Sequence, residues 1–508
     1  MSASNWAGRC FASRPALLFW GSLLLFAGWS RGSISDDEVQ TRYLVASQIW
    51  DNGTIPDLQQ HSLGQSLTML PAIITADLSS RFLVDAERQS EFQHWAGPFI
   101  YKTVILPLLA ALALLAFYIL GVRLGLSPEH AVWCAITLGF ASSWLFYVKT
   151  IGTGPEVTAW ALWAMVCYTG TGERAKRLGL ASLFLGLTLL YHQELLIPVT
   201  LGVVLMVLHE RRHQQFSFAS LGVLLVPMTL CGLAALWYGY THTGQVFAAG
   251  LGTGGETSQP GVFASYPGVH TATILFGAQN GFFWFNPILF TSVLLLIPGG
   301  RRWHPALTRA ALPVAAYLLL VASLAVAPQV SGWGQRLLVP IIPFLVLALG
   351  LALSPRMNQR GWRLVLLGVF ALNIIFQATV AFDDHLGVQE QTRQVKETLA
   401  KGGEETLTGW RSNDLAGKLR NLGIPLGDSP AVQQAWKSSE QRRTGFRENL
   451  WWLKMSHESE SKTMVIGSFA AGLLMLISGL LCLFFACYSS AAFGGASTLA
   501  PILPKKKR

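Results

Sequence analysis

The chain has 508 residues, of which 52% are hydrophobic and only 13% are charged. A soluble domain normally carries about 25% charged residues, so this composition excludes an ordinary soluble protein. The net charge is +10, but the basic residues gather in short segments between apolar blocks. They form no stripe interleaved with aromatic side chains, which argues against a nucleic-acid partner.

The apolar blocks predict an all-α polytopic membrane protein. Most of them approach the roughly 20 residues that cross a bilayer core, and within lipid such blocks must be helices because every backbone group needs an internal partner. About twelve spans are expected, at residues 14–31, 98–121, 129–149, 155–171, 178–190, 195–208, 217–239, 281–298, 310–328, 336–353, 362–381 and 463–488. The fifth and sixth are short and could form one broken hairpin that meets at residues 191–194.

The first span has a second interpretation. Arg9 and Arg14 precede or open its apolar run, and Gly28 and Ser30 offer a small-x-small cleavage site, so the segment could be a signal peptide. We favour an uncleaved span. Under either interpretation, the residues that follow it are exported.

The basic residues between the spans predict the topology. If the N-terminus is cytoplasmic, the loops at 150–154, 191–194 and 240–280 are exported, and these contain no Lys or Arg. The cytoplasmic segments then hold Arg123, Arg174, Lys176, Arg177, Arg211, Arg212, Arg301, Arg302, Arg309, Arg356, Arg360 and the tail Lys505-Lys506-Lys507-Arg508. This alternation follows the positive-inside rule. We expect a multi-pass membrane protein whose working face is on the exported side.

Three parts of the chain are expected. Residues 1–381 form a membrane module, in which the exported segment 31–97 supplies interfacial helices. Residues 382–462 are polar and predict a small soluble domain on the exported side. Residues 463–508 form the last span and a basic cytoplasmic tail.

Acidic residues stand at two exported positions. Asp36-Asp37-Glu38 comes directly after the first span. Such a cluster suits a general base with a tuned pKa or a metal site with oxygen ligands, or else it is a solvated cap that fixes topology. Glu156 opens the fourth span, where a carboxylate is a normal partner of the helix dipole as well as a candidate site residue.

Other exported loops carry further candidates. His192 and Glu194 join two spans, and ionisable residues at membrane depth suggest function, whereas in water they would be ordinary loop residues. Asn286 follows an aromatic run and could bind a sugar or a head group. Arg336 is the only basic residue of its exported loop, and it either binds phosphate or snorkels to the interface.

Taken in chain order, four stretches resemble the GT-C superfamily of membrane glycosyltransferases. The likeness is to its bacterial polyprenyl-phosphate-sugar-dependent members, which are related to protein O-mannosyltransferases and lipid A aminoarabinose transferases. The stretches are Asp36-Asp37-Glu38 with Tyr43 and Leu44; Gly64-Gln65-Ser66-Leu67 with Leu70-Pro71; Tyr147-Val148-Lys149-Thr150 with Pro155-Glu156; and Gln335-Arg336-Leu337-Leu338-Val339-Pro340-Ile341-Ile342-Pro343-Phe344. The segment before Arg336, which includes Trp333, departs from the family's pattern, and residues 382–462 have no such resemblance.

The resemblance implies a GT-C-like helical bundle that moves a sugar from polyprenyl phosphate to a glycan, lipid or protein acceptor, with inversion. Asp36 or Asp37 would be the general base, and Arg336 and Lys149 would bind the donor phosphate. Glu156 would assist the acceptor or, with Asp37, hold a divalent metal, which some members of the superfamily use; no other cofactor is implied. The expected substrate contacts are Glu38, Tyr43, Gln65, His192, Glu194, Asn286 and Trp333.

Two other functions compete with the enzyme. A twelve-span secondary transporter would carry charges near the bilayer midplane, yet Asp and Glu are absent from most span centres. A noncatalytic scaffold that presents residues 382–462 would leave Asp36, Asp37, Glu156 and Arg336 without a role. The sequence therefore favours a membrane glycosyltransferase.

Overall fold

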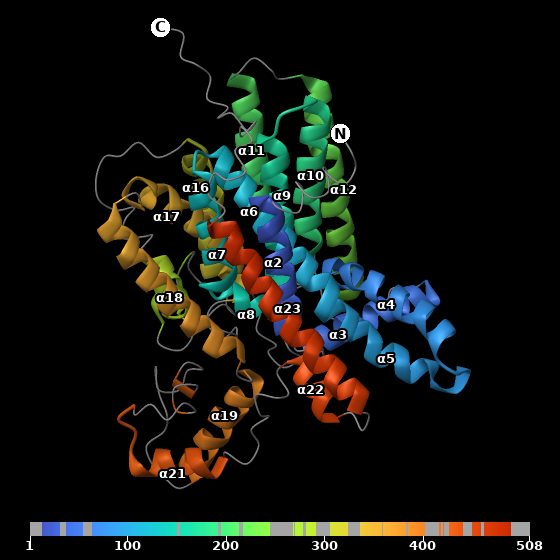
Figure 1. Cartoon of the computed structure of the whole chain (residues 1–508). Helices are drawn as coiled ribbons and strands as arrows, with labels where there is room; N and C mark the ends of the chain where they lie inside the picture. Colours follow the sequence, from blue (N-terminus) through green and yellow to red (C-terminus); the bar gives the residue numbers. More distant parts are fainter. Residues whose placement is uncertain are drawn as a thin grey trace, which may run out of the picture.

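The computed structural model describes residues 13–30, 37–53, 63–149, 153–191, 195–212, 217–243, 268, 270–277, 281–290, 305–323, 336–357, 359–382, 385–401, 416–417, 420, 426–439, 450–458 and 462–488. Every regular element among them is a helix, and these residues contain no strand. The prediction of an all-α polytopic fold is confirmed (Figure 1). By length and composition, four of the described helices could cross a membrane: Ala86–Arg123, Phe218–Thr241, Leu337–Ser354 and Ile466–Cys487.

Except for two interrupted segments, the other expected spans coincide with further helices of the same bundle. The helices of the bundle are α2 (Arg14–Trp29), α6 (Leu106–Arg123), α7 (Pro128–Phe140), α9 (Thr153–Thr169), α10 (Arg174–Tyr191), α11 (Leu196–Arg212), α12 (Phe218–Thr243), α16 (Pro305–Ser323), α17 (Ile342–Met357), α18 (Arg360–Phe382) and α23 (Lys462–Tyr488). One apolar core runs through them and includes Leu18, Phe117 and Trp144. The fifth and sixth spans, expected to be short, are longer helices: α10 has 18 residues and α11 has 17.

Two expected spans are interrupted, and the cause is a contact between them. Residues 129–149 divide into α7 and the short α8 (Trp144–Lys149). At the break, the Ser143 amide donates a hydrogen bond to Asn286 Oδ1 at 2.7 Å. Asn286 itself ends α14 (Phe282–Phe285), so the span expected at 281–298 is broken at the same place. Side-chain hydrogen bonds replace helical backbone bonds at both breaks.

The first and last long helices pack closely together through small residues. Gly21 of α2 faces Gly479 of α23, and a Cβ on Gly479 would lie 2.8 Å from Leu25 Cγ. The short α22 (Trp451–Glu458) covers the end of this pair, where the indoles of Trp451 and Trp452 donate to the carbonyls of residues 27 and 28, each at 2.9 Å. Small residues at such contacts let membrane helices approach one another.

An arm projects sideways from one end of the bundle (Figure 1). It consists of α3 (Asp37–Asn52), α4 (Leu63–Leu83), the 3-10 helix η1 (Ala86–Arg88) and α5 (Gln89–Ile100), and a π-helical turn, η2 (Tyr101–Ile105), continues α5 into α6. Asp77 holds the arm together, because its carboxylate accepts hydrogen bonds from Trp50 at 3.2 Å and from Gln93 at 2.9 Å. The arm occupies the segment expected to form interfacial helices, and their place in the membrane stays a prediction.

The polar segment 382–462 contains a small core of its own. Helices α19 (His385–Lys401) and α21 (Pro430–Ser438) pack through Val395, Leu399, Val432, Ala435 and Trp436. Beside them, Arg420 forms a buried ion pair with Asp428 at 2.7 Å and lies over the Trp436 ring. The boundaries expected for the three parts of the chain stay predictions.

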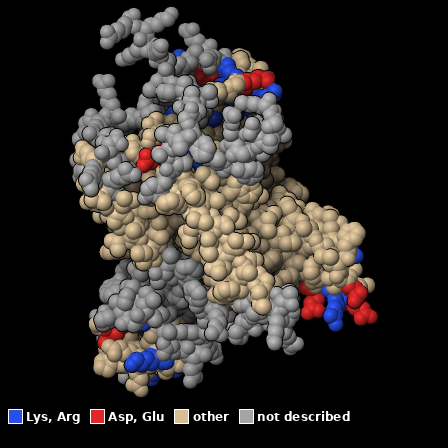
Figure 2. Space-filling model, in the orientation of Figure 1, with Lys and Arg blue, Asp and Glu red and all other residues tan. Residues whose placement is uncertain are grey.

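Charged side chains gather at the ends of the molecule, with an uncharged band between them (Figure 2). At one end of the bundle, the guanidinium groups of Arg123 and Arg177 donate to carbonyls at the C-terminus of α9, and Arg174 pairs with Glu210 at 2.7 Å. Basic side chains at a helix C-terminus complement its dipole. All three arginines belong to segments expected to be cytoplasmic, and the orientation in the membrane stays a prediction.

We predict that Gly479→Leu destabilises the bundle, because the added side chain would overlap Leu25 and push α23 away from α2. Overpacking of this kind costs about 1–3 kcal/mol. The measurement is thermal unfolding of the purified protein in detergent. Gly467→Leu in the same helix is the matched control, since a Cβ there meets nothing within 4 Å. Equal melting temperatures for the two variants would contradict the packing described above.

Candidate functional site

Buried polar side chains meet where the arm joins the bundle. Arg42 of α3, Gln65 of α4, Tyr101 of η2 and Glu156 of α9 come from four different elements, and all four are buried. Burying ionisable groups away from water is costly unless they are paired or hydrogen-bonded. Such a cluster in a membrane protein is therefore a candidate functional site.

A continuous chain of hydrogen bonds joins these residues. The Arg42 guanidinium donates to Gln65 Oε1, and Gln65 Nε2 donates to the Tyr101 hydroxyl at 3.1 Å. Tyr101 in turn donates to Glu156 Oε1 at 2.5 Å, a length typical of a hydroxyl bound to a carboxylate. Every bond runs in the same direction, so the chain ends on Glu156 as the acceptor.

The backbone approaches closely wherever this network needs it. A Cβ on Gly64 would lie 2.5 Å from the Tyr191 ring, so α4 can pack against the end of α10 only because residue 64 is glycine. One turn later, the hydroxyls of Thr68 and Tyr191 are hydrogen-bonded. On the other side of Glu156, Gly154 packs against Val339 at the start of the segment that carries Arg336.

The π-helical turn brings two neighbouring polar residues into the interior. Tyr101 and Lys102 are adjacent in sequence, and both are buried. π-Helical turns inside longer helices are rare and are often found at functional sites. Lys102 and Arg42 both attract the Glu156 carboxylate electrostatically, so two buried cations partly compensate its charge.

One oxygen of Glu156 is not used by the network. Glu156 Oε2 is buried and has no hydrogen-bond partner in the part of the chain that the structure describes. A buried carboxylate oxygen without a partner is energetically unfavourable. Glu156 also stands in the first turn of α9, where the helix dipole favours a negative charge. The arrangement therefore presents an acceptor atom to which a substrate hydroxyl could donate.

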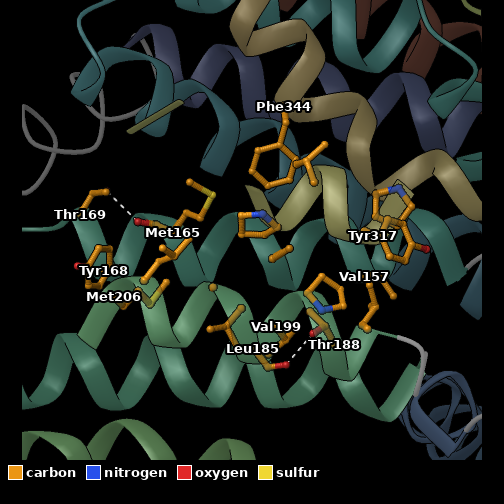
Figure 3. A pocket seen from close by; sticks show the side chains of 18 of the residues that line it. Val157, Met165, Tyr168, Thr169, Leu185, Thr188, Val199, Met206, Tyr317 and Phe344 are labelled. Atoms are coloured by element: carbon orange, nitrogen blue, oxygen red, sulfur yellow. Dashed lines mark hydrogen bonds between the residues drawn. The ribbon is translucent and has the colours of Figure 1, made fainter. Parts of the chain in front are cut away.

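A largely apolar cavity of about 560 Å³ lies along α9 (Figure 3). Its lining starts at Val157, the residue of α9 that follows Glu156, and extends along that helix to Thr169, a length of about 18 Å at 1.5 Å per residue. The opposite walls come from α10, α11, α16 and α17, and Tyr317 and Phe344 point into the cavity. Ligand sites in proteins are commonly apolar cavities of about this size with a few polar groups at one end.

Two of the expected site residues, Gln65 and Glu156, belong to this network. Lys149 is buried at the end of α8, at the same end of the bundle.

Tyr43 and Asn286 use their polar atoms within the fold. The Tyr43 hydroxyl donates to the carbonyl of Gln93 at 3.2 Å, and Asn286 forms hydrogen bonds with backbone groups of α14 and of Ser143. Burial raises the pKa of Tyr43 to about 12, so this phenol is neutral near pH 7. Their roles as substrate contacts stay predictions.

Other expected residues cannot be placed in the site. Asp36, His192, Glu194 and Trp333 lie outside the described residues. Asp37 and Glu38 open α3, and Arg336 opens the 3-10 helix η5 (Arg336–Ile341), but only the backbone is described at these three positions. Since α3 also carries Arg42, position 37 is about 8 Å from the network along the helix axis.

Sequence reasoning missed Arg42, Tyr101 and Lys102. Lys102 lies inside the span expected at 98–121, and a charged residue within a span was a signal for function. Arg42 and Tyr101 had no such signal, because their role depends on partners from other helices.

The described residues contain no group of three or more His, Cys, Asp or Glu that could hold a metal ion. A metal at Glu156 would therefore need ligands from other parts of the chain.

No protein-family model matches the chain, and no curated protein matches its sequence. Among solved structures, the chain is similar to two crystal structures of ArnT from Cupriavidus metallidurans, one bound to undecaprenyl phosphate and one in the apo state. Each is 12% identical to this chain, and the match covers 96% of this chain and 77% of ArnT, with TM-scores of 0.42 and 0.45 respectively. At this level the likeness concerns the fold, and the role of each residue depends on the geometry of this chain.

We predict that Tyr101→Phe lowers the stability of the protein by about 1.5–3 kcal/mol, because it removes a hydrogen bond to a buried carboxylate. Thermal unfolding in detergent measures the loss. Tyr118→Phe is the control, since Tyr118 lies on the same continuous helix and its hydroxyl has no hydrogen bond to the residues described. If Tyr101→Phe melts like Tyr118→Phe, the network does not stabilise the site.

Proposed function

We propose that this protein is a membrane glycosyltransferase, which moves a sugar from a polyprenyl-phosphate donor to an acceptor on the exported face of a bacterial inner membrane. One observation carries the proposal: a buried carboxylate with an unused oxygen, on which the buried cations Arg42 and Lys102 act electrostatically, directly precedes the residue of α9 where the lining of an apolar cavity starts. A substrate with a hydrocarbon tail, an anionic link and a hydroxylated head matches these three features in order.

The lipid part of the donor would occupy the cavity. Its walls are almost entirely apolar along the part of α9 that follows Glu156. A prenyl chain in this cavity whose head lies toward Val157 would have its phosphate near the first turn of α9, which carries Glu156. The charged residues of the cavity lining, Arg177 and Glu210, stand at its other end.

The phosphate would lie near Arg42 and Lys102. Both cations are buried beside Glu156, and Arg336 and Lys149 are the further phosphate ligands that the family resemblance implies. When the bond to the sugar breaks, negative charge builds up on the leaving phosphate. Positive groups already in place stabilise that charge without reorganisation.

The transfer itself would be a direct displacement with inversion. The acceptor hydroxyl attacks the anomeric carbon, the bond from that carbon to the phosphate oxygen breaks, and polyprenyl phosphate leaves. Asp36 or Asp37 takes the hydroxyl proton, as the family resemblance implies, and Asp37 opens the helix that carries Arg42. Glu156 Oε2 accepts a hydrogen bond from a hydroxyl of the acceptor or of the sugar.

The described side chains fit a substrate at Glu156 better than a divalent metal ion. A hard cation would find a carboxylate oxygen there. However, Arg42 and Lys102 lie close enough to act on the same carboxylate, and their charges would repel such an ion. We therefore assign Glu156 to substrate binding, and we derive no step through a metal.

We predict that the purified protein releases free polyprenyl phosphate from at least one member of a panel of polyprenyl-phosphate sugars when glycan, lipid or protein acceptors are offered. Asp37→Asn and Glu156→Gln should lower this release about 100-fold or more, as expected for the loss of a proton acceptor or a substrate contact in the transition state. Arg336→Ala should lower it as well.

Glu173→Gln serves as the control for this assay, because Glu173 is exposed at the opposite end of the bundle, where its carboxylate forms an ion pair with Lys176. Melting temperatures would verify that each variant is folded. Full activity in Glu156→Gln would remove that residue from the site. No release by the native protein from any donor would reject the transferase and favour the transporter or the scaffold.

We further predict that filling the cavity weakens donor binding. A Cβ on Gly202 meets nothing within 4 Å, and Gly202 lines the cavity, so Gly202→Phe should occupy its space without disturbing the fold. The KM for the donor should rise about tenfold or more, which corresponds to about 1.4 kcal/mol of lost binding. Gly222→Phe is the matched control, because Gly222 is equally open but lies outside the cavity. An unchanged KM in Gly202→Phe would mean that the tail binds elsewhere.

A further inference from the structure

The cavity along α9 has a second, charged end. Its lining starts at Val157 and reaches Tyr168 and Thr169 where α9 ends. Arg177 of α10 and Glu210 of α11 complete the lining there. Figure 3 shows Tyr168 and Thr169 at the opposite end of the cavity from Val157. The proposed donor site therefore leaves the polar groups of this end without a role.

Positive charge predominates at this end, in the part of the chain that the structure describes. The guanidinium groups of Arg123, Arg174 and Arg177 stand here with the carboxylate of Glu210, which pairs with Arg174 at 2.7 Å. Arg123 lies close enough to Arg177 for the two charges to act on each other. Arginine stays protonated at physiological pH, so the cluster keeps a net positive charge.

Capping of α9 uses only some of these N–H groups. Arg177 Nη1 donates to the carbonyls of Tyr168 and Gly170 at 3.1 and 2.8 Å, which complements the helix dipole. By contrast, the Nε atoms of Arg174 and Arg177 are buried and have no hydrogen-bond partner among the described residues. A buried donor without an acceptor is energetically unfavourable. These two donors therefore suit an anionic ligand.

The middle of the cavity fits a hydrocarbon chain. The side chains between the two ends are apolar and come largely from α10 and α11: Leu185, Val199, Leu205 and Met206. Methionine adapts to chains of irregular shape. A ligand with an anionic head and an apolar chain therefore matches the cavity when its head lies at Arg177.

The cavity is one helix away from the lipid. Gly202, Leu205 and Met206 of α11 line it, whereas Val204 and Leu208 of the same helix are exposed. Exposed apolar side chains on a helix of a membrane bundle contact acyl chains, because no water is present at that depth. Phospholipid is thus the amphiphile nearest to this end of the cavity.

We propose that the charged end of the cavity binds the phosphate of an anionic phospholipid from the leaflet on this side, with one acyl chain in the cavity. The basic residues between the spans predict that this leaflet is the cytoplasmic one. That leaflet carries anionic lipids, and basic pockets between membrane helices bind their head groups. Guanidinium groups bind phosphate oxygens through parallel N–H···O hydrogen bonds. The inference holds whatever reaction the protein catalyses.

The cavity would then have two occupants that exclude each other. Under the proposed function, and resting on it, the donor tail enters from the end at Val157 and the phospholipid chain from the end at Arg177. Because both need the same space, anionic phospholipid should raise the KM for the donor and leave kcat unchanged.

Native mass spectrometry of the full chain in detergent tests the binding, with phosphatidylglycerol and phosphatidylcholine of the same acyl chains offered together. We expect the chain to retain phosphatidylglycerol about tenfold better than phosphatidylcholine, as charge-assisted hydrogen bonds to phosphate in a positively charged pocket predict. This comparison needs only the native chain.

Two variants locate the head and the tail of the lipid. Arg177→Gln should lower the retention of phosphatidylglycerol about tenfold, because it removes a charged donor from the pocket. Lys176→Gln is the matched control, since it removes the same charge from an exposed side chain of the same helix that pairs with Glu173. Gly202→Phe, which fills the cavity, should also lower retention, and Gly222→Phe is its control.

Four outcomes would overturn the proposal. Equal retention of the two lipids would exclude recognition of the anionic head. An equal loss in Lys176→Gln and Arg177→Gln would mean that diffuse surface charge attracts the lipid. Full retention in Gly202→Phe would mean that no chain enters the cavity. Displacement by excess inorganic phosphate would assign the site to free phosphate.

Melting temperatures would verify that each variant is folded. None of these measurements uses a sugar donor. Failure of the transferase assay is therefore distinguishable from failure of lipid binding.

Discussion

The hydrogen bond from Tyr101 to Glu156 is the contact on which the arrangement of the site depends. A carboxylate in an apolar interior is tolerated only when donors and opposite charges compensate its lost hydration. Tyr101 supplies the donor from the helix that continues the arm into α6, whereas Glu156 belongs to the bundle. Gln65 and Arg42 extend the same chain of bonds to α4 and α3. One buried charge thus holds three helices of the arm against the bundle.

This constraint accounts for other features of the arm. The hydrogen bonds of the network require the helices around it to approach closely. Glycine occupies two of these close approaches: Gly64 lies against Tyr191, and a Cβ on Gly97 would overlap the Tyr43 hydroxyl. Asp77 fixes the mutual rotation of α3, α4 and α5 from within.

Helix α9 connects the polar site with the apolar cavity. Its first turn carries Glu156, and the turns from Val157 to Thr169 form one wall of the cavity. Under the proposed function, a single rigid helix would set the distance between the head group and the hydrocarbon tail of a lipid-linked substrate. Residues on regular elements hold such distances better than residues on loops.

The positions of the helices could be predicted because an apolar block reveals a lipid environment locally, whatever the rest of the chain does. The all-α class and the helices of the expected spans followed from that alone, and Gln65 and Glu156 were found among short motifs. The breaks at residues 143 and 286 could not be foreseen, because they depend on a hydrogen bond between residues 143 positions apart.

The same reason separates what sequence and tertiary structure decide about the site. Local composition is enough to place a segment in lipid, since hydrocarbon requires each span to satisfy its own backbone. The network of Arg42, Gln65, Tyr101 and Glu156 has no local pattern, because its bonds join residues 23, 36 and 55 positions apart. Only the packing of α3, α4 and η2 against α9 decided which polar residues surround the buried carboxylate.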